Sequence, residues 1–441
     1  MTFGNFAVEY EQRAYNPERM RRERLERAHA ALKKYGLGAI ITYNYDNHRY
    51  LGYYSSHQYG RRRPGDYALL IRDAGFPYVG ADPLPPAWEE VKTPWLKDRM
   101  VLKTSRQFML LQAYPQKPEY MVGEWDDMAA EVKGLLKKHG VEDLPCGMDL
   151  SNFNMVMACQ KAGIKLVDGN HVMAAARMIK TEDEVECLRM AGVITESAHW
   201  EVCHALRPGV TEWEIAGVAA NALFKRGAEE LEGPSFVICS GERSGFGVPA
   251  MPTDKIVRPG DMVIIDINGV SFQGYRTCFY RTYVVGDKPT EFQKEIYHCA
   301  YEGLMALTSS IKPGITNLEA ANNWKNQGRE TGQWGAMPKW PAPGRYYFGS
   351  VAHHIGLCSG DPGPVIPGTV EVLAPEGVPA LTLEKNMCFA VEVGCFTWDG
   401  KKWAKDGAKI EHCGRVTDTG FEVFYRFPMK DLIACGLPGV Y

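Results

Sequence analysis

One stretch of the sequence, residues 260–282, constrains the fold more than any other. It reads Gly-Asp-Met-Val-Ile-Ile-Asp-Ile-Asn-Gly-Val-Ser-Phe-Gln-Gly-Tyr-Arg-Thr-Cys-Phe-Tyr-Arg-Thr, so that four apolar residues lead into the carboxylate of Asp266. A glycine-containing bend follows, and a second strand-like segment ends in Arg281-Thr282. This pattern predicts a β-hairpin with an inward-facing acid. Because an unpaired carboxylate is costly to bury, we expect a cation or a hydrogen-bond donor beside Asp266.

Three later segments carry side chains of the same kind. A turn of small residues holds His353 and His354, a second apolar run contains Glu392, and a further strand-like segment ends in Glu411. Carboxylate and imidazole groups of this kind hold divalent metals in proteins, and they also serve as general acids and bases. The sequence therefore predicts one site assembled from several strands, with Glu392, Glu411, His353 and Asp266 as its catalytic residues.

The order and surroundings of these residues resemble the creatinase, aminopeptidase P, prolidase and methionine aminopeptidase family. The resemblance implies a pita-bread catalytic domain and, for the metal enzymes of the family, five ligands in the order Asp, Asp, His, Glu, Glu. In this sequence they fall on Asp266, Cys278, His353, Glu392 and Glu411, so that a cysteine stands at the second aspartate position.

The cysteine leaves the metal content open. A thiolate can ligate zinc or iron, so one alternative is a metal with Cys278 as a ligand. The others are a mononuclear site without the cysteine and a site that works with protons alone. We expect at most one divalent ion per chain (Fe, Zn or Mn), or none. A purely structural role also stays open for Asp266 and Glu392, as partners of Arg281 or Lys409 in ion pairs.

Two features of the second half predict an internally duplicated domain. The Pro208-Gly209 turn is followed by Thr211 and Glu214 at the spacing of a helix-capping box, and the same pattern recurs from Pro313 to Glu319. Thr181 and Glu184 form a similar box at the start of a long helical pattern, in a segment that resembles the domain-joining segment of the family. We therefore predict an α/β (α+β) fold with a creatinase-like α/β domain at 1–176. A pita-bread catalytic domain with pseudo-twofold duplication follows at 177–441.

Composition narrows the compartment and the partners. The 441 residues, 45% of them hydrophobic, are enough for two domains with cores of their own. With 50 Lys+Arg against 53 Asp+Glu, the net charge of -3 argues against nucleic acid as a partner. The sequence has no apolar run of signal-peptide or membrane-spanning length, and its 12 cysteines form no Cys-x-x-Cys pair. These features predict a cytoplasmic protein with a small-molecule substrate and no membrane partner, and the family resemblance implies a homodimer.

Altered motifs set the expected reaction. No histidine lies within Ser240–Pro249, where the resemblance places one that the peptidases use, and Leu357–Pro362 replaces a His-Glu-x-Pro motif. Both losses remove groups that transfer protons or polarise a carbonyl. The turn Ser240-Gly-Glu-Arg243 and the segment Gly356-Leu357-Cys358 are similar instead to the dimethylsulfoniopropionate lyases of this fold.

We therefore expect a non-peptidase hydrolase or lyase that cleaves a C–N or C–S bond of a small polar metabolite, with cationic metabolites among the candidates. The alternatives are a metal-dependent Xaa-Pro-type dipeptidase or aminopeptidase, and a non-catalytic protein that binds a ligand or partner in the same cleft. Aromatic rings can enclose a cation, and Asp361 can replace an acid that the lyases carry two residues earlier. The predicted substrate-binding residues are Tyr280, Tyr275, Phe348, His354 and Asp361.

Overall fold

The computed structural model describes most of the chain. The described residues are 15–52, 67–80, 93–102, 122–150, 152–229, 231, 236–246, 250–286, 288–325, 332–334, 344–348, 352–367 and 380–436. They divide into two compact units, one of Pro17–Arg177 and one that begins at Met178 and includes Asn16. None of the helices in these ranges is long and apolar enough to cross a membrane.

The first unit is built on a five-stranded sheet in the order β3-β2-β1-β4-β5. Strand β1 pairs antiparallel with β2 and parallel with β4, so the sheet is mixed. The first helix of this unit, α2, follows Asn16 and buries Met20, Leu25, Ala28 and Leu32. The elements of this unit are α2 (Pro17–Lys34), β1 (Ala39–Thr42), α3 (Tyr45–Tyr50), β2 (Tyr67–Ile71), β3 (Tyr78–Gly80), η1 (Pro94–Arg99), α6 (Val122–Lys138), β4 (Cys146–Met148), α7 (Phe153–Lys161), β5 (Leu166–Asp168) and α8 (Asn170–Arg177).

The second unit contains two larger sheets with helices outside them. Its elements are α9 (Glu182–Ala205), α10 (Glu212–Lys225), β6 (Phe236–Ser240), η3 (Gly241–Phe246), β7 (Met262–Ile267), β8 (Ser271–Phe272), β9 (Tyr275–Arg276), β10 (Tyr280–Val285), α11 (Glu291–Ser310), α12 (Asn317–Lys325), β11 (Gly332–Trp334), β12 (Gly344–Phe348), β13 (Ala352–His354), β14 (Cys388–Trp398), β15 (Ala408–Val416), β16 (Phe421–Val423) and β17 (Ile433–Cys435).

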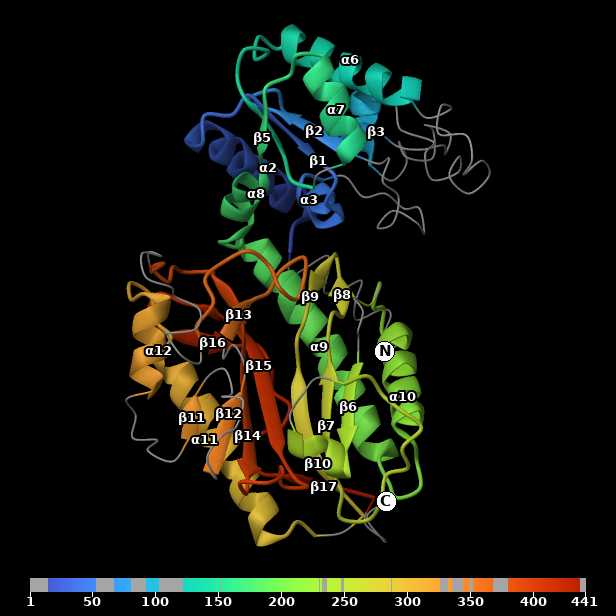
Figure 1. Cartoon of the computed structure of the whole chain (residues 1–441), viewed down its shortest axis with the longest axis vertical. Coiled ribbons are helices and arrows are strands. Elements are labelled where there is room, and N and C mark those ends of the chain that lie inside the picture. Colours follow the sequence, from blue (N-terminus) through green and yellow to red (C-terminus); the bar gives the residue numbers. More distant parts are fainter. Residues whose placement is uncertain are drawn as a thin grey trace. The chain divides into compact units, whose positions relative to one another are not determined.

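Each sheet of the second unit has its own pair of helices. The four-stranded sheet runs β17-β10-β7-β6, and the six-stranded sheet runs β11-β12-β14-β15-β16 with β13 paired to β14. Figure 1 shows α9 and α10 beside the first sheet and α11 and α12 beside the second. Strand β10 of one sheet packs against β15 of the other, so residues from both sheets meet at this seam. This mixed α/β unit has the pita-bread fold that the sequence predicts.

The predicted capping boxes are confirmed. In α9 the Thr181 hydroxyl accepts the Glu184 N–H at 3.1 Å, while the Glu184 carboxylate accepts the Thr181 N–H at 2.7 Å. The same reciprocal bonds join Thr211 to Glu214 at α10 and Thr316 to Glu319 at α12. Each box satisfies backbone donors that a helix N-terminus otherwise leaves free. The repeated sequence pattern thus marks the start of the second helix in both halves.

The hairpin predicted from residues 260–282 is present with one elaboration. Strands β7 and β10 pair antiparallel, which places Asp266 directly opposite Tyr280. Between them lies a smaller hairpin of β8 and β9, whose turn holds Gln273 and Gly274 at positive φ. This turn gives the bend that the glycine predicts, and it returns the chain so that Cys278 lies two residues before β10.

Candidate metal centre

The register of the second sheet places acids from two strands on one face. Glu392 of β14 lies directly opposite Glu411 of β15, and Gly394 lies opposite Lys409. Because side chains alternate between the faces of a strand, Lys409 and Glu411 project to the same side. The Tyr280 backbone N–H, from the first sheet, donates to Glu411 Oε2 at 3.1 Å. The two sheets therefore share a cluster of polar groups at their seam.

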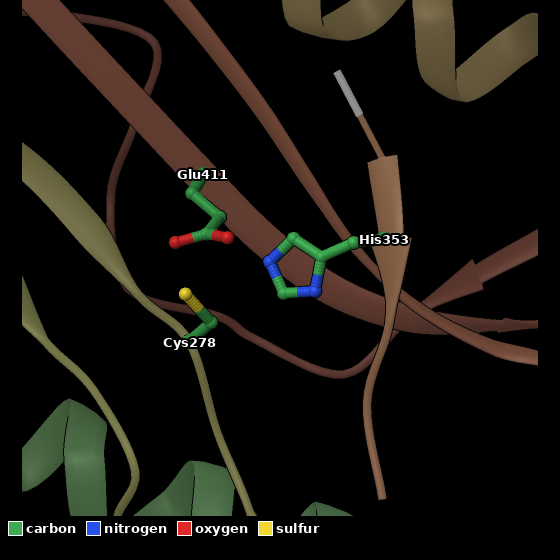
Figure 2. A group of neighbouring side chains, drawn as sticks. All are labelled: Cys278, His353 and Glu411. Carbon is green, nitrogen blue, oxygen red and sulfur yellow. The ribbon is translucent and has the colours of Figure 1, made fainter. Parts of the chain in front are cut away.

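Three side chains of this cluster are close enough to hold one metal ion. One ligand atom each from Cys278, His353 and Glu411 lies within 4.8 Å of the other two. Figure 2 shows the Cys278 sulfur and one edge of the His353 ring directed at the Glu411 carboxylate. Thiolate, imidazole and carboxylate are all ligands of zinc. Among the described residues, Asp266 and Glu392 are not part of this group.

The His353 ring is oriented by the backbone. Its Nδ1 lies 3.0 Å from the carbonyl oxygen of His354, which also accepts the Asp361 N–H at 3.1 Å. With Nδ1 carrying the proton, Nε2 is left as the acceptor on the ring edge that faces Cys278 and Glu411 in Figure 2. Metal-binding histidines commonly hold their second nitrogen in this way. The local contacts therefore favour His353 as a ligand through Nε2.

The environment of Glu411 fits a bound cation. The residue is fully buried, and its Oε1 atom has no nitrogen or oxygen donor among the described residues. Burial, together with the charges of Glu392 and Asp266, raises the pKa of the Glu411 carboxyl well above its usual value. Burial and the same acids also raise the pKa of the Cys278 thiol. A bound cation would reverse both effects, since it favours the carboxylate and the thiolate. The donor set therefore fits a metal ion.

Asp266 and Glu392 are the two remaining acids at the seam, and a lysine contacts Glu392. The Lys409 ammonium is 2.6 Å from Glu392 Oε2, and both side chains are about nine-tenths buried. Asp266 accepts the Phe279 N–H at 3.1 Å, and burial raises its pKa to about 7 against the opposing charge of Lys409. Of the ion pairs that the sequence leaves open, the one between Glu392 and Lys409 is therefore present. Arg281 instead donates to the backbone carbonyls of Tyr280, Glu411 and Phe427.

Tyr280 and Tyr275 contact charged groups of the protein itself. The Lys409 ammonium lies 3.8 Å from the centre of the Tyr280 ring, so the cation on this aromatic face is an internal one. The Tyr275 hydroxyl donates to Glu184 Oε1 at 2.5 Å, inside the capping box of α9. Both rings are buried. These contacts join both tyrosines to charged groups of the protein, and their role in binding a cationic substrate stays a prediction.

His354 and Asp361, both predicted to bind substrate, contact residues outside the metal-binding group. Next to His353 on β13, His354 projects from the opposite side and packs edge-on against Phe389, with 4.4 Å between the ring centres. Asp361 forms a buried ion pair with Lys180 at 2.6 Å. The alternation of side chains along the strand accounts for the direction of His354, and substrate binding by the two residues stays a prediction. Phe348 of β12 lies opposite Gly394 of β14, and the Phe348 side chain is outside the described part of the structure.

Arg243, part of the resemblance to the lyases, is held within the second unit. Its guanidinium donates to Glu212 Oε2, and the same carboxylate oxygen accepts the Thr253 N–H at 2.9 Å. The other oxygen of Glu212 accepts the N–H and the hydroxyl of Ser240. Glu212 is fully buried. The turn from Ser240 to Arg243 is therefore fixed to the start of α10 by a closed hydrogen-bond network.

Comparison with known proteins assigns the family. The sequence profile of metallopeptidase family M24 matches residues 186–418, more than half of the chain. The chain therefore belongs to metallopeptidase family M24.

Curated relatives are named as peptidases. The probable dipeptidase PepE of Mycobacterium tuberculosis is 28% identical over 267 residues, which cover 60% of this chain and 64% of the relative. The Xaa-Pro dipeptidase of Pyrococcus horikoshii is 33% identical over 201 residues, covering 45% of this chain and 53% of the relative. The chain thus matches somewhat less than two thirds of each relative's length.

Solved structures share the fold over nearly the whole chain. The Xaa-Pro dipeptidase of Bacillus anthracis superimposes with a TM-score of 0.70 and 21% identity, covering 94% of this chain and 99% of the other. Dipeptidase PepE of Mycobacterium ulcerans gives a TM-score of 0.68 and 20% identity, covering 96% and 100%. At this level of identity the likeness concerns the fold.

These relatives overturn the expected reaction. The prediction of a non-peptidase lyase or hydrolase, with peptidase activity unlikely, is wrong, because the similar proteins are named dipeptidases and Xaa-Pro peptidases. That prediction relied on the absence of two histidines, although four residues at ligand positions of the family are retained: Asp266, His353, Glu392 and Glu411. Carboxylates and an imidazole are the groups that hold a hydrolytic metal, so their retention was the stronger signal.

Proposed function

We propose that this protein is a metal-dependent peptidase that hydrolyses dipeptides, with Xaa-Pro dipeptides as the first class to test. The observation that carries the proposal is the group of Cys278, His353 and Glu411, whose ligand atoms lie within 4.8 Å of one another. The names of the M24 relatives support the same reaction. A metal bound by these three residues would polarise the peptide carbonyl as a Lewis acid.

The neighbouring acids supply the proton chemistry. Glu392 is 8% exposed, whereas Glu411 is fully buried, so Glu392 is the more accessible carboxylate for a water molecule. We assign it the role of general base, which takes a proton from the attacking water. Lys409, 2.6 Å from Glu392 Oε2, fixes the direction of this carboxylate. Tyr280 keeps its proton, because burial and the charge of Asp266 raise its pKa far above the usual value.

A dipeptide panel tests the proposal. The protein is incubated with Zn²⁺, Mn²⁺ or Co²⁺ and with Xaa-Pro and proline-free dipeptides, and the released amino acids are measured by mass spectrometry. We expect hydrolysis by the wild type. The control variant Glu302→Gln should hydrolyse the dipeptides like the wild type. Glu302 lies on the exposed side of α11 and contacts only His298 among the described ion pairs. The absence of hydrolysis with every metal and every dipeptide would contradict the proposal.

A further inference from the structure

The seam between the two sheets contains two adjacent groups of charged residues with different partners. The first is the metal group, Cys278, His353 and Glu411. The second consists of Asp266, Glu392 and Lys409, which we call the lysine group. Glu411 borders both, because it lies opposite Glu392 on β14 and two residues after Lys409 on β15. The question that this arrangement raises is which cation neutralises the acids of the lysine group.

The structure gives the Lys409 ammonium a defined position in this group. Its Nζ atom is 2.6 Å from Glu392 Oε2 and 3.8 Å from the centre of the Tyr280 ring. The backbone of the same residue is fixed to the first sheet, because the Thr282 hydroxyl accepts the Lys409 N–H at 3.0 Å and donates to its carbonyl at 2.7 Å. The ammonium is therefore held by contacts at both ends of the residue.

We infer that Lys409 is the built-in counter-cation of Asp266 and Glu392, so that the centre takes a single divalent ion, bound by Cys278, His353 and Glu411.

Electrostatics gives the physical reason. An ion bound between Asp266 and Glu392 would have to displace Lys409 from Glu392 Oε2 or share a buried site with its positive charge. Like charges at short range in a buried site repel strongly, because little water is present to screen them. The metal group offers an acceptor that Lys409 does not contact, because the buried Glu411 Oε1 has no nitrogen or oxygen donor among the described residues.

The ligand set also predicts which ion is preferred. A cysteine sulfur beside an imidazole and one carboxylate favours a borderline-soft ion such as Zn²⁺ or Co²⁺ over the hard ions Mg²⁺ and Ca²⁺. The inference rests on the metal-dependent hydrolase proposed above. Its readout is metal content and ligation, however, so a protein that binds one ion but cleaves no dipeptide would refute the proposed function and leave the inference standing.

Cobalt titration of the metal-free protein tests the inference. We expect a thiolate-to-cobalt charge-transfer absorption that saturates at one equivalent of Co²⁺ per chain, with one equivalent retained after gel filtration. The absorption should be lost in Cys278→Ser. In Lys409→Met, elemental analysis should find a second equivalent, because Asp266 and Glu392 are then without their lysine. The matched control is Lys405→Met, which removes a lysine from the pair with Asp261, outside the cluster, and should stay at one equivalent.

The outcomes separate cleanly. Two equivalents in the wild type, or none, would overturn the inference without reference to any variant. A wild-type charge-transfer absorption that persists in Cys278→Ser would assign the sulfur ligand elsewhere and also overturn it. The inference would also be overturned if a folded Lys409→Met protein, with wild-type circular dichroism, still binds only one ion.

Discussion

The ion pair of Lys180 and Asp361 predicts a large loss of stability when one partner is removed. Its atoms lie 2.6 Å apart, and the two side chains are only 1% and 2% exposed, so water screens the pair very little. Lys180→Met leaves the Asp361 carboxylate buried without its counter-charge. Breaking a buried pair in this way costs about 3–5 kcal/mol.

The loss should appear in the turn that carries His353. The Asp361 N–H donates to the His354 carbonyl, and the Asp361 carboxylate packs where a side chain on Gly356 would lie. Hydrogen exchange followed by mass spectrometry measures the opening of residues 352–361 directly. A change of 3–5 kcal/mol corresponds to exchange that is roughly 100- to 5,000-fold faster.

A second pair provides the matched control. Lys385 and Asp418 are 2.7 Å apart, but their side chains are 49% and 75% exposed. Lys385→Met should therefore change stability by less than about 1 kcal/mol. In the double variant Lys180→Met with Asp361→Asn, no charge is left unpaired, and part of the stability should return. A change below about tenfold in Lys180→Met, with no recovery in the double variant, would refute the reasoning.

Three further predictions concern activity, reactivity and assembly. Glu392→Gln and Glu411→Gln should each lower dipeptide turnover by at least ~100-fold with unchanged circular dichroism, and full activity in either variant would remove that residue from the site. The sulfur of Cys203 lies 3.3 Å from that of Cys435, and this contact is the main cause that lowers the pKa of the Cys203 thiol to about 7. Burial raises the pKa of the Cys239 thiol to about 11. Because the thiolate is the reactive form, the rate of iodoacetamide labelling of Cys203 should rise as the pH increases through 7. At pH 7, labelling of Cys203 should be slower in Cys435→Ala. Labelling of Cys203 that is no faster than that of the partly buried Cys299 would contradict this prediction. We also propose a homodimer with a small-molecule substrate, and light scattering that shows a monomer at working concentration would rule the dimer out.

Local patterns were sufficient to predict several elements. The capping boxes at Thr181, Thr211 and Thr316 follow from a spacing of three residues, and the hairpin around Asp266 follows from an apolar run and a glycine bend. Such features depend on neighbours a few residues away, so the sequence contains all the information that they need. The family resemblance then implied the fold.

Side-chain partners distant in sequence could not be predicted in the same way. Asp361 meets Lys180 and Tyr275 meets Glu184 only after the chain has folded, at separations of 181 and 91 residues. The direction of His354, opposite to that of His353, depends on where β13 begins and on its pairing with β14. Lys409 was visible as a possible ion partner, and its spacing of two residues from Glu411 was the available signal that both share one face.

In the proposed mechanism, hydrolysis of a dipeptide depends on a metal held by Cys278, His353 and Glu411. The most direct measurement is the rate of proline release from an Xaa-Pro dipeptide before chelation, after chelation, and after one equivalent of Zn²⁺ or Co²⁺ per chain is restored. We predict that proline release stops on chelation and returns with the metal in the wild type, but not in Cys278→Ser. Proline release that survives complete metal removal, or that never occurs with the metal bound, would contradict the claim.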